Sequence, residues 1–208
     1  MNLRLDWCSH EAAKYACEHW HYSRKIPKSK LNKIGVWENN KFIGAVIYGV
    51  GSGNSTRGEK YGLAKTHEVA ELQRVALTTH KTPTSKIVSV SIRMIRKANP
   101  NLQMLISFAD EAEQNHHGGI YQATNWIYLG TVKGYGGFRI HGQSMHPRVV
   151  GLKGWKQSLP WLQQHIDPNA SRIKALKHRY VYPLNNEVRQ RVQPLAMPYP
   201  KRASEEGL

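Results

Sequence analysis

Apolar residues recur along the first part of the chain with the spacings of regular secondary structure. Between residues 9 and 20, apolar residues are spaced three or four positions apart and form one stripe, which predicts an amphipathic helix that Ser9 caps. The stripe consists of Ala13, Ala16, Cys17 and Trp20. Two apolar runs follow, 33–37 and 42–50, and the polar residues 38–41 between them predict a β-hairpin.

The middle of the chain predicts alternating strands and helices. Residues 68–77 alternate as in a strand, and residues 84–98 have the period of a helix that Thr84 or Ser85 caps. The expected buried side of this helix carries Val88, Ile92 and Ile95. Each of these segments has the length of an ordinary element in a globular domain.

The next elements decide the fold class. Residues 103–109 form a mostly apolar run, typical of a strand buried on both faces of a sheet. A helix is expected from 118 to about 128, with Ile120, Ala123 and Ile127 inward, and a strand from 126 to 131. Strands and helices that alternate in this way predict an α/β fold with a mixed central sheet flanked by helices.

The character of the chain changes after about residue 150. The expected features are a short helix within 155–165 that Pro160 interrupts, a basic run at 172–179, a last strand at 180–182 and a loose tail from 197. We therefore predict a catalytic domain at 1–150 and a basic C-terminal extension at 151–208 that packs on or beside it.

Charge identifies the kind of partner. The chain of 208 residues has 30 Lys and Arg but 14 Asp and Glu, a net charge of +16, which predicts a polyanionic partner. The longest apolar stretch, 42–50, is too short to cross a membrane, and the N-terminus lacks a secretory signal. Two cysteines do not make a disulfide scaffold. Nucleic acid and a cytoplasmic location are the resulting expectations.

Five cations lie close together without an acidic residue between them. They are Arg24, Lys25, Lys28, Lys30 and Lys33. Such a run suits contact with a phosphate backbone, and Trp20 and Tyr22 beside it offer faces on which an unstacked base could lie. The same interpretation applies to residues 172–179. The alternative for both runs is a solvated surface.

Short motifs point to a known family. The segments 21–24 (HYSR), 71–75 (ELQRV) and 107–110 (SFAD), followed by a helix that contains Tyr121, resemble the phage Mom family of DNA-modifying proteins. The order of elements from 71 to 130 resembles the Gcn5-related N-acetyltransferase (GNAT) fold. The resemblance covers about residues 15–150.

The resemblance implies a reaction, a substrate and a place. Proteins like Mom put an acetamido (carbamoylmethyl) group on the N6 amine of adenine and so mask the DNA from restriction enzymes in the cytoplasm of the infected host. The amine is stacked and paired inside double-stranded DNA, so the adenine must be flipped out of the helix. The amine is also a poor nucleophile, so the reaction needs close positioning and a proton acceptor.

Four residues are candidates for this chemistry. Asp110 ends a buried strand, where open α/β sheets place their ligands, and is the first candidate for the proton acceptor. His21 could also take the proton, with Tyr22 beside it. The resemblance makes Tyr121 the proton donor to the leaving group, and it implies iron, for which His21 and Asp110 are the candidate ligands. His116 and His117, near Asp110, form a further potential metal cluster. Each residue also has an ordinary structural explanation, as a core or capping side chain.

The donor is expected beside the helix at 84–98. Hydroxyls and cations there could hold phosphate at the helix N-terminus, and the candidates are Arg74, Thr79, Lys81, Thr84, Ser85 and Lys86. Acetyltransferases usually carry a glycine-rich loop here, whereas residues 74–79 contain no glycine. The activated acyl donor, an acetyl-CoA-like molecule or an aminoacylated RNA, therefore stays open. An ordinary strand-to-helix turn is the alternative.

Two other functions fit parts of this pattern. An N-acetyltransferase that modifies a protein or a small amine would share the fold but require tight binding of acetyl-CoA. A non-catalytic DNA-binding protein would explain the charge, but it would leave Asp110, His21 and Tyr121 without a role.

Overall fold

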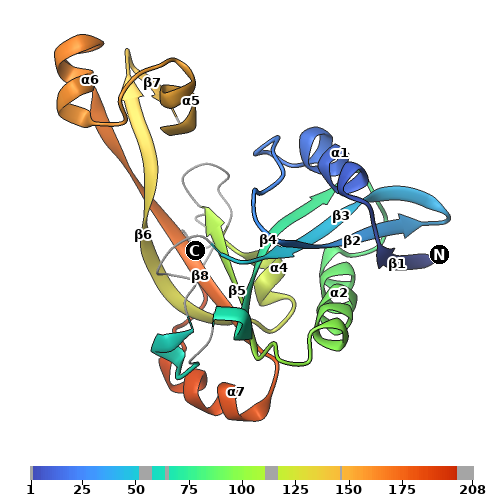
Figure 1. Ribbon diagram of the computed structural model, residues 1–208. Coiled ribbons are helices and arrows are strands. Elements are labelled where there is room, and N and C mark those ends of the chain that lie inside the picture. The colour runs from blue at the N-terminus through green and yellow to red at the C-terminus, as the bar shows by residue number, and fades with distance from the viewer. Residues whose placement is uncertain (1, 52–57, 64–65, 111–116, 146, 201–208) are drawn as a thin grey trace, which may run out of the picture. The chain divides into compact units, whose positions relative to one another are not determined.

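The protein forms two compact units, each built from separate stretches of the chain. The computed structural model describes residues 2–51, 58–63, 66–110, 117–145 and 147–200 (Figure 1). The first unit comprises 1–107, 118–129 and 180–199, and the second comprises 108–117, 130–179 and 200–208. No helix in the described ranges is long and apolar enough to cross a membrane.

Eight strands form a mixed sheet, the class that the sequence predicts, although the first and the seventh strand were not predicted. They are β1 (Leu3–Trp7), β2 (Leu31–Glu38), β3 (Lys41–Gly49), β4 (Val69–Leu77), β5 (Met104–Asp110), β6 (Ile127–Ile140), β7 (Gln143–Met145) and β8 (Ser171–Pro183). Their order in the sheet is β1-β2-β3-β4-β5-β8-β6-β7. Strands β1 to β4 pair antiparallel, and β4 pairs parallel with β5. The mixed α/β class is confirmed.

Two helices cover opposite faces of the sheet in the first unit (Figure 1). Helix α1 (His10–Trp20) begins after Ser9, whose hydroxyl accepts the Ala12 N–H at 3.1 Å, and its small buried residues pack on Ala45 and Ile47 of β3. Helix α2 (Thr84–Ala98) lies on the other face, where the Tyr48 hydroxyl is 2.7 Å from that of Ser91. Neighbouring residues of a strand point to opposite faces, so Ile47 faces α1 and Tyr48 faces α2.

Strands β4 and β5 separate after a short stretch of pairing. Only residues 69–71 of β4 pair with 104–106 of β5, whereas β4 continues to pair with β3 as far as Leu77. Within the described ranges, the parallel pairing of β4 and β5 thus extends over three residues of each strand.

Two predicted helix features are wrong. The helix expected at 118–128 is a single turn, α4 (Gly119–Gln122), because Asn125 adopts a left-handed φ of 59° and the chain enters β6 at Ile127. Pro83, not Thr84 or Ser85, is the N-cap residue of α2, and it makes no side-chain capping bond. The predicted buried positions of α2 are confirmed.

The second unit has its own apolar core. Helices α5 (Pro147–Leu152) and α6 (Leu159–His165) contribute to it, and its fully buried members are Phe138, Ile140, Val150, Leu162 and Ala170. Pro160 lies in the first turn of α6, where its missing N–H costs no hydrogen bond, so it begins this helix rather than interrupting it.

The C-terminal part differs from the predicted one in three ways. The basic run 172–179 lies within β8, which is much longer than the strand expected at 180–182 and occupies a place between β5 and β6. Helix α7 (Asn186–Val192) and the 3-10 turn η4 (Gln193–Leu195) were not predicted. Two 3-10 turns before β4, η2 (Glu59–Tyr61) and η3 (Thr66–Glu68), were not predicted either.

The start of the expected loose tail is attached to the first unit. The Met197 N–H donates to the Tyr128 carbonyl at 2.9 Å, and the Tyr199 hydroxyl donates to the Trp126 carbonyl at 2.7 Å. The prediction of a loose segment is therefore wrong at residues 197–199, while residues 201–208 lie outside the described residues. The assignment of catalysis to residues 1–150 stays a prediction.

Candidate functional site

His21 follows α1 directly and is buried as a neutral ring. The Ser23 N–H donates to its Nδ1 at 3.1 Å, and the Ser23 hydroxyl lies 2.8 Å from the same atom. A backbone N–H can only donate, so Nδ1 carries a lone pair and the proton of the neutral ring lies on Nε2. Burial first, and then the positive charge of Arg74, lower the pKa of His21 from 6.5 to about 4. At neutral pH this side chain is a hydrogen-bond donor through Nε2.

The substitution Arg74→Gln is expected to raise the pKa of His21 above its value of about 4, because one of the two causes of the shift is removed. An NMR titration of the ring nitrogens measures it. Since the folded pKa lies below the unfolded value of 6.5, the stability from the neutral ring is present above pH 6.5 and is lost as the pH falls toward 4. Arg4→Gln, which removes a cation stacked on Trp37, is the control and should leave the titration unchanged.

Side chains of β4 attach the segment that follows His21 to the sheet. The Arg74 Nε donates to the Lys25 carbonyl at 3.4 Å, and the Gln73 Oε1 accepts the Ser29 hydroxyl at 3.4 Å. Arg74 was predicted to bind the donor, and the structure places it beside this segment. Tyr22 is about half exposed, with its ring 4.3 Å from that of His21.

The five predicted DNA-binding cations differ in their surroundings. Lys25, Lys28 and Lys30 are exposed. Arg24 has a left-handed φ of 50°, and its guanidinium donates to two carbonyls at the end of α1, those of Glu18 and His19 at 2.9 and 2.7 Å. Lys33 lies within β2 and is half-buried. Four of the five are thus exposed, and one of these, Arg24, also caps a helix.

Tyr121 and Ser107, which lies on β5, form a buried hydrogen-bonded pair. The Ser107 hydroxyl is 2.7 Å from the Leu72 carbonyl and 2.8 Å from the Tyr121 hydroxyl. It has one proton, so it can donate to only one of these two oxygens at a time. Burial raises the pKa of Tyr121 to about 12. This phenol therefore keeps its proton at neutral pH and can supply it.

Close packing holds the tyrosine ring. The Tyr121 ring lies 5.2 Å from that of Trp126 and 5.0 Å from that of Tyr180. Gly118 precedes it at a left-handed φ of 85°, and a side chain there would collide with the Tyr180 ring. Glycine is therefore required at this turn.

Asp110 ends β5 and belongs to the second unit. Its carboxylate is only 8% exposed and forms an ion pair with the Lys177 ammonium of β8 at 3.2 Å. The sequence placed Asp110 correctly at a strand end, but it did not identify Lys177 as its partner.

No metal site is assigned. In the described ranges, no group of three or more His, Cys, Asp or Glu side chains could hold a metal ion. His21 and Asp110 belong to different units, and each has the partner given above. The cluster predicted around His116 lies largely outside the described residues, which resume at His117. The iron that the resemblance implies thus finds no support.

The predicted donor residues surround the loop between β4 and α2. Thr79, Lys81 and Lys86 are exposed, and Thr84 and Ser85 are half-buried in the first turn of α2. The loop itself is bound by a carboxylate that the sequence pattern did not single out. Glu38, the last residue of β2, accepts the backbone N–H groups of Lys81 and Thr82 at 3.0 and 2.7 Å.

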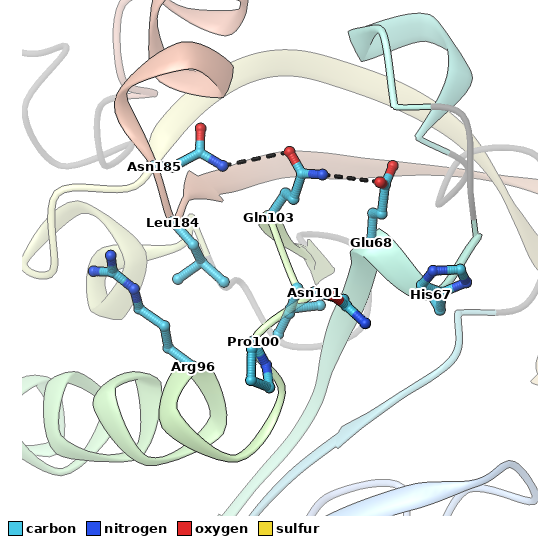
Figure 2. A pocket seen from close by; sticks show the side chains of 9 residues that line it. His67, Glu68, Arg96, Pro100, Asn101, Gln103, Leu184 and Asn185 are labelled. Atoms are coloured by element: carbon cyan, nitrogen blue, oxygen red, sulfur yellow. Dashed lines mark hydrogen bonds between the residues drawn. The ribbon is translucent and has the colours of Figure 1, made fainter.

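A polar pocket of about 390 Å³ lies at the opposite, amino ends of β4 and β5 (Figure 2). A chain of hydrogen bonds crosses it, from the Asn185 amide to Gln103 at 3.4 Å and from the Gln103 amide to Glu68 at 2.8 Å. Arg96 adds a positive charge, and His67 is also among the lining residues. None of the predicted site residues lines this pocket.

Comparisons with known proteins agree with the fold and identify the family. The Mom protein family matches residues 2–201. Methylcarbamoylase Mom of Escherichia phage Mu is 25% identical over 206 residues, a match that covers 96% of this chain and 84% of that protein.

Two solved structures share the fold. Both are of aminoglycoside acetyltransferase AAC(6')-Ib, one with coenzyme A and kanamycin and one with coenzyme A, and both give a TM-score of 0.51. They are 8% and 9% identical to this chain. Each match covers 92% of this chain and 99% of the acetyltransferase chain. The match to the family thus covers nearly the full length of the chain, and the fold is that of an acetyltransferase. This chain belongs to the Mom protein family and has the GNAT fold.

Proposed function

We propose that this protein is a transferase that puts a carbamoylmethyl-type group on the N6 amine of adenine in phage DNA and so protects it from restriction. The observation that carries the proposal is the match to the Mom family over residues 2–201, with a relative named methylcarbamoylase. The net charge of +16 supports a DNA substrate. The transfer would take place in the cytoplasm of the bacterial host.

The surroundings of three residues support a division of roles. In the transfer, a bond forms between N6 and the electrophilic carbon of the donor, the N6 proton leaves, and the donor's leaving group departs. We assign the N6 proton to the Asp110 carboxylate, which is buried and ion-paired. A tyrosine with a pKa of about 12 suits the opposite task, so Tyr121 protonates the leaving group.

His21 has a third role in this proposal. With a pKa of about 4 it is a weak base, which argues against proton uptake, whereas its Nε2–H can donate a hydrogen bond to charge that develops on the donor. Tyr22, half exposed beside His21, offers a face for the flipped adenine.

Mass spectrometry of nucleosides tests the proposal. DNA from cells that express the protein is expected to contain a deoxyadenosine in which a carbamoylmethyl group replaces one N6 hydrogen. DNA from cells with the empty vector is the control. Folded protein expressed together with the other genes of its phage, but without any modified deoxyadenosine, would contradict the proposal.

Exposed cations of the segment after His21 are proposed to contact the phosphate backbone. Neutralising Lys25, Lys28 and Lys30 together by substitution with Gln should weaken duplex binding and reduce the salt dependence, by about 0.9 in the log–log slope for each phosphate that is no longer neutralised. Fluorescence anisotropy at several salt concentrations measures the slope. A control with three exposed lysines elsewhere, Lys14, Lys97 and Lys153, should change it less. An unchanged slope in the first variant would show that this segment does not touch DNA.

A further inference from the structure

We infer that the loop before α2 does not bind a diphosphate, because the carboxylate of Glu38 already accepts two of its backbone N–H groups, and that the donor is not a coenzyme A thioester held there. The inference rests on the proposed transfer only in calling the second substrate a donor. It concerns coenzyme A, with which two structural relatives were solved.

In GNAT proteins the loop before this helix presents backbone N–H groups to the pyrophosphate, as the resemblance implies. Here the corresponding loop presents them to Glu38. Its Oε2 accepts the Lys81 N–H at 3.0 Å, and its Oε1 accepts the Thr82 N–H at 2.7 Å and the Thr82 hydroxyl at 2.5 Å. These bonds lower the pKa of Glu38, the Thr82 hydroxyl contributing most, so the side chain is a carboxylate at neutral pH.

Several other groups of the loop and the first helical turn also form bonds within the protein. The Thr78 N–H donates to Ile43, the Lys86 and Ile87 N–H groups donate to Pro83, and Pro83 itself has no N–H. His80 bridges the loop from the other side, since its two ring nitrogens lie 2.6 Å from the Thr78 carbonyl and 3.1 Å from the Thr84 hydroxyl. The loop is thus closed by internal bonds at both ends.

A pyrophosphate at this place would have to displace Glu38 or approach it. Displacement would break three hydrogen bonds to a carboxylate, and approach would bring like charges together in a region where Thr82 is only 3% exposed. The segment 74–79 contains no glycine, so side chains hinder the close approach of a phosphate to its backbone. Lys81 and Lys86 are exposed and would attract an anion without shaping a site for it.

Glu38 therefore acts as a built-in anion that stabilises the loop. A closed loop takes the place of the phosphate site that the sequence predicts at Thr79, Lys81, Thr84, Ser85 and Lys86. The donor belongs to a chemical class whose recognition does not depend on a diphosphate at this loop.

Calorimetry and NMR on the full-length protein without DNA test the inference. Coenzyme A, acetyl-CoA and inorganic pyrophosphate are titrated separately at about 0.3 M salt, where unspecific attraction to a basic protein is largely screened. We expect no saturable binding of any of them tighter than about 1 mM, and unchanged amide signals of Lys81 and Thr82. Micromolar binding of coenzyme A that shifts these two amide signals would overturn the inference.

A variant of Glu38 provides a second test of the inference. Glu38→Ala frees the two N–H groups and should increase the affinity for pyrophosphate at least tenfold over the wild type. Glu18→Ala, which raises the net charge equally but lies on α1, is the matched control and should not. An equal increase in both variants would show that only net charge matters and would overturn the role of Glu38. If Glu38→Ala does not fold, Glu38→Gln and the wild-type titration decide.

The outcome is independent of the proposed function. Modified deoxyadenosine in cells, together with absent coenzyme A binding, agrees with both proposals. Absent modification with absent coenzyme A binding contradicts the proposed transfer alone, and coenzyme A binding at the α2 loop contradicts the role of Glu38 whether or not DNA is modified.

Discussion

The substitution Asp110→Asn is expected to lower the rate of DNA modification by about 10²- to 10⁴-fold, the usual contribution of general acid–base catalysis. The amide has nearly the same shape as the carboxylate but cannot take up the N6 proton. It also loses the ion pair with Lys177, so the charge of this buried pair changes as well. The measurement is the yield of modified deoxyadenosine per unit time with equal amounts of folded protein.

The matched control for this substitution is Asp6→Asn on β1. It makes the same chemical change at an exposed carboxylate, whose partner Arg4 lies 3.4 Å away, and should leave the rate unchanged. Duplex binding by Asp110→Asn should persist, because the variant removes negative charge from a basic protein. A rate above half that of the wild type would mean that another group accepts the proton.

The substitution Trp126→Ala should have the largest effect on stability, with a loss of about 3–5 kcal/mol in the free energy of unfolding. Trp126 is fully buried, and its ring lies 5.2 Å from that of Tyr121 and 5.7 Å from that of Tyr182. Its removal leaves a cavity beside the proposed proton donor, so activity should fall together with stability. Urea denaturation followed by circular dichroism measures the loss.

Trp126→Phe separates ring volume from hydrogen bonding. Within the described part of the chain, the indole Nε1 of Trp126 is buried without a hydrogen-bond partner, so phenylalanine removes an unsatisfied donor while keeping an aromatic ring. We expect less than half of the loss seen with alanine. Equal losses in the two variants would show that the indole makes a polar contact that stabilises the fold.

Local periodicity predicted much of the first unit. Helix α1 and its Ser9 cap, the β2–β3 hairpin, β4 and the buried side of α2 agree with the pattern, because each is set by residues close in sequence. The pattern failed after α4. There Asn125 turns the chain with a left-handed φ, and Trp126 is drawn into an aromatic cluster, so tertiary packing ended a helix that the spacing of apolar residues favoured.

For the candidate site, the sequence predicted the positions of residues but not their partners. Asp110 at the end of a buried strand and His21 after α1 could be located from sequence. Their partners could not, because Lys177 is far from Asp110 along the chain and lies in a run of several cations. Ser107 belonged to a recognised motif, yet its hydrogen bond to Tyr121, 14 positions away, could not be predicted from the sequence.

The sequence by itself determined the strongly basic charge, the alternation of strands and helices, and the motifs that mark the Mom family, since all three are properties of residue order. The tertiary structure alone decided that His21 is neutral and that the loop before α2 is closed. Both follow from desolvation and from hydrogen bonds between distant residues, such as Glu38 and Lys81, which are 43 positions apart.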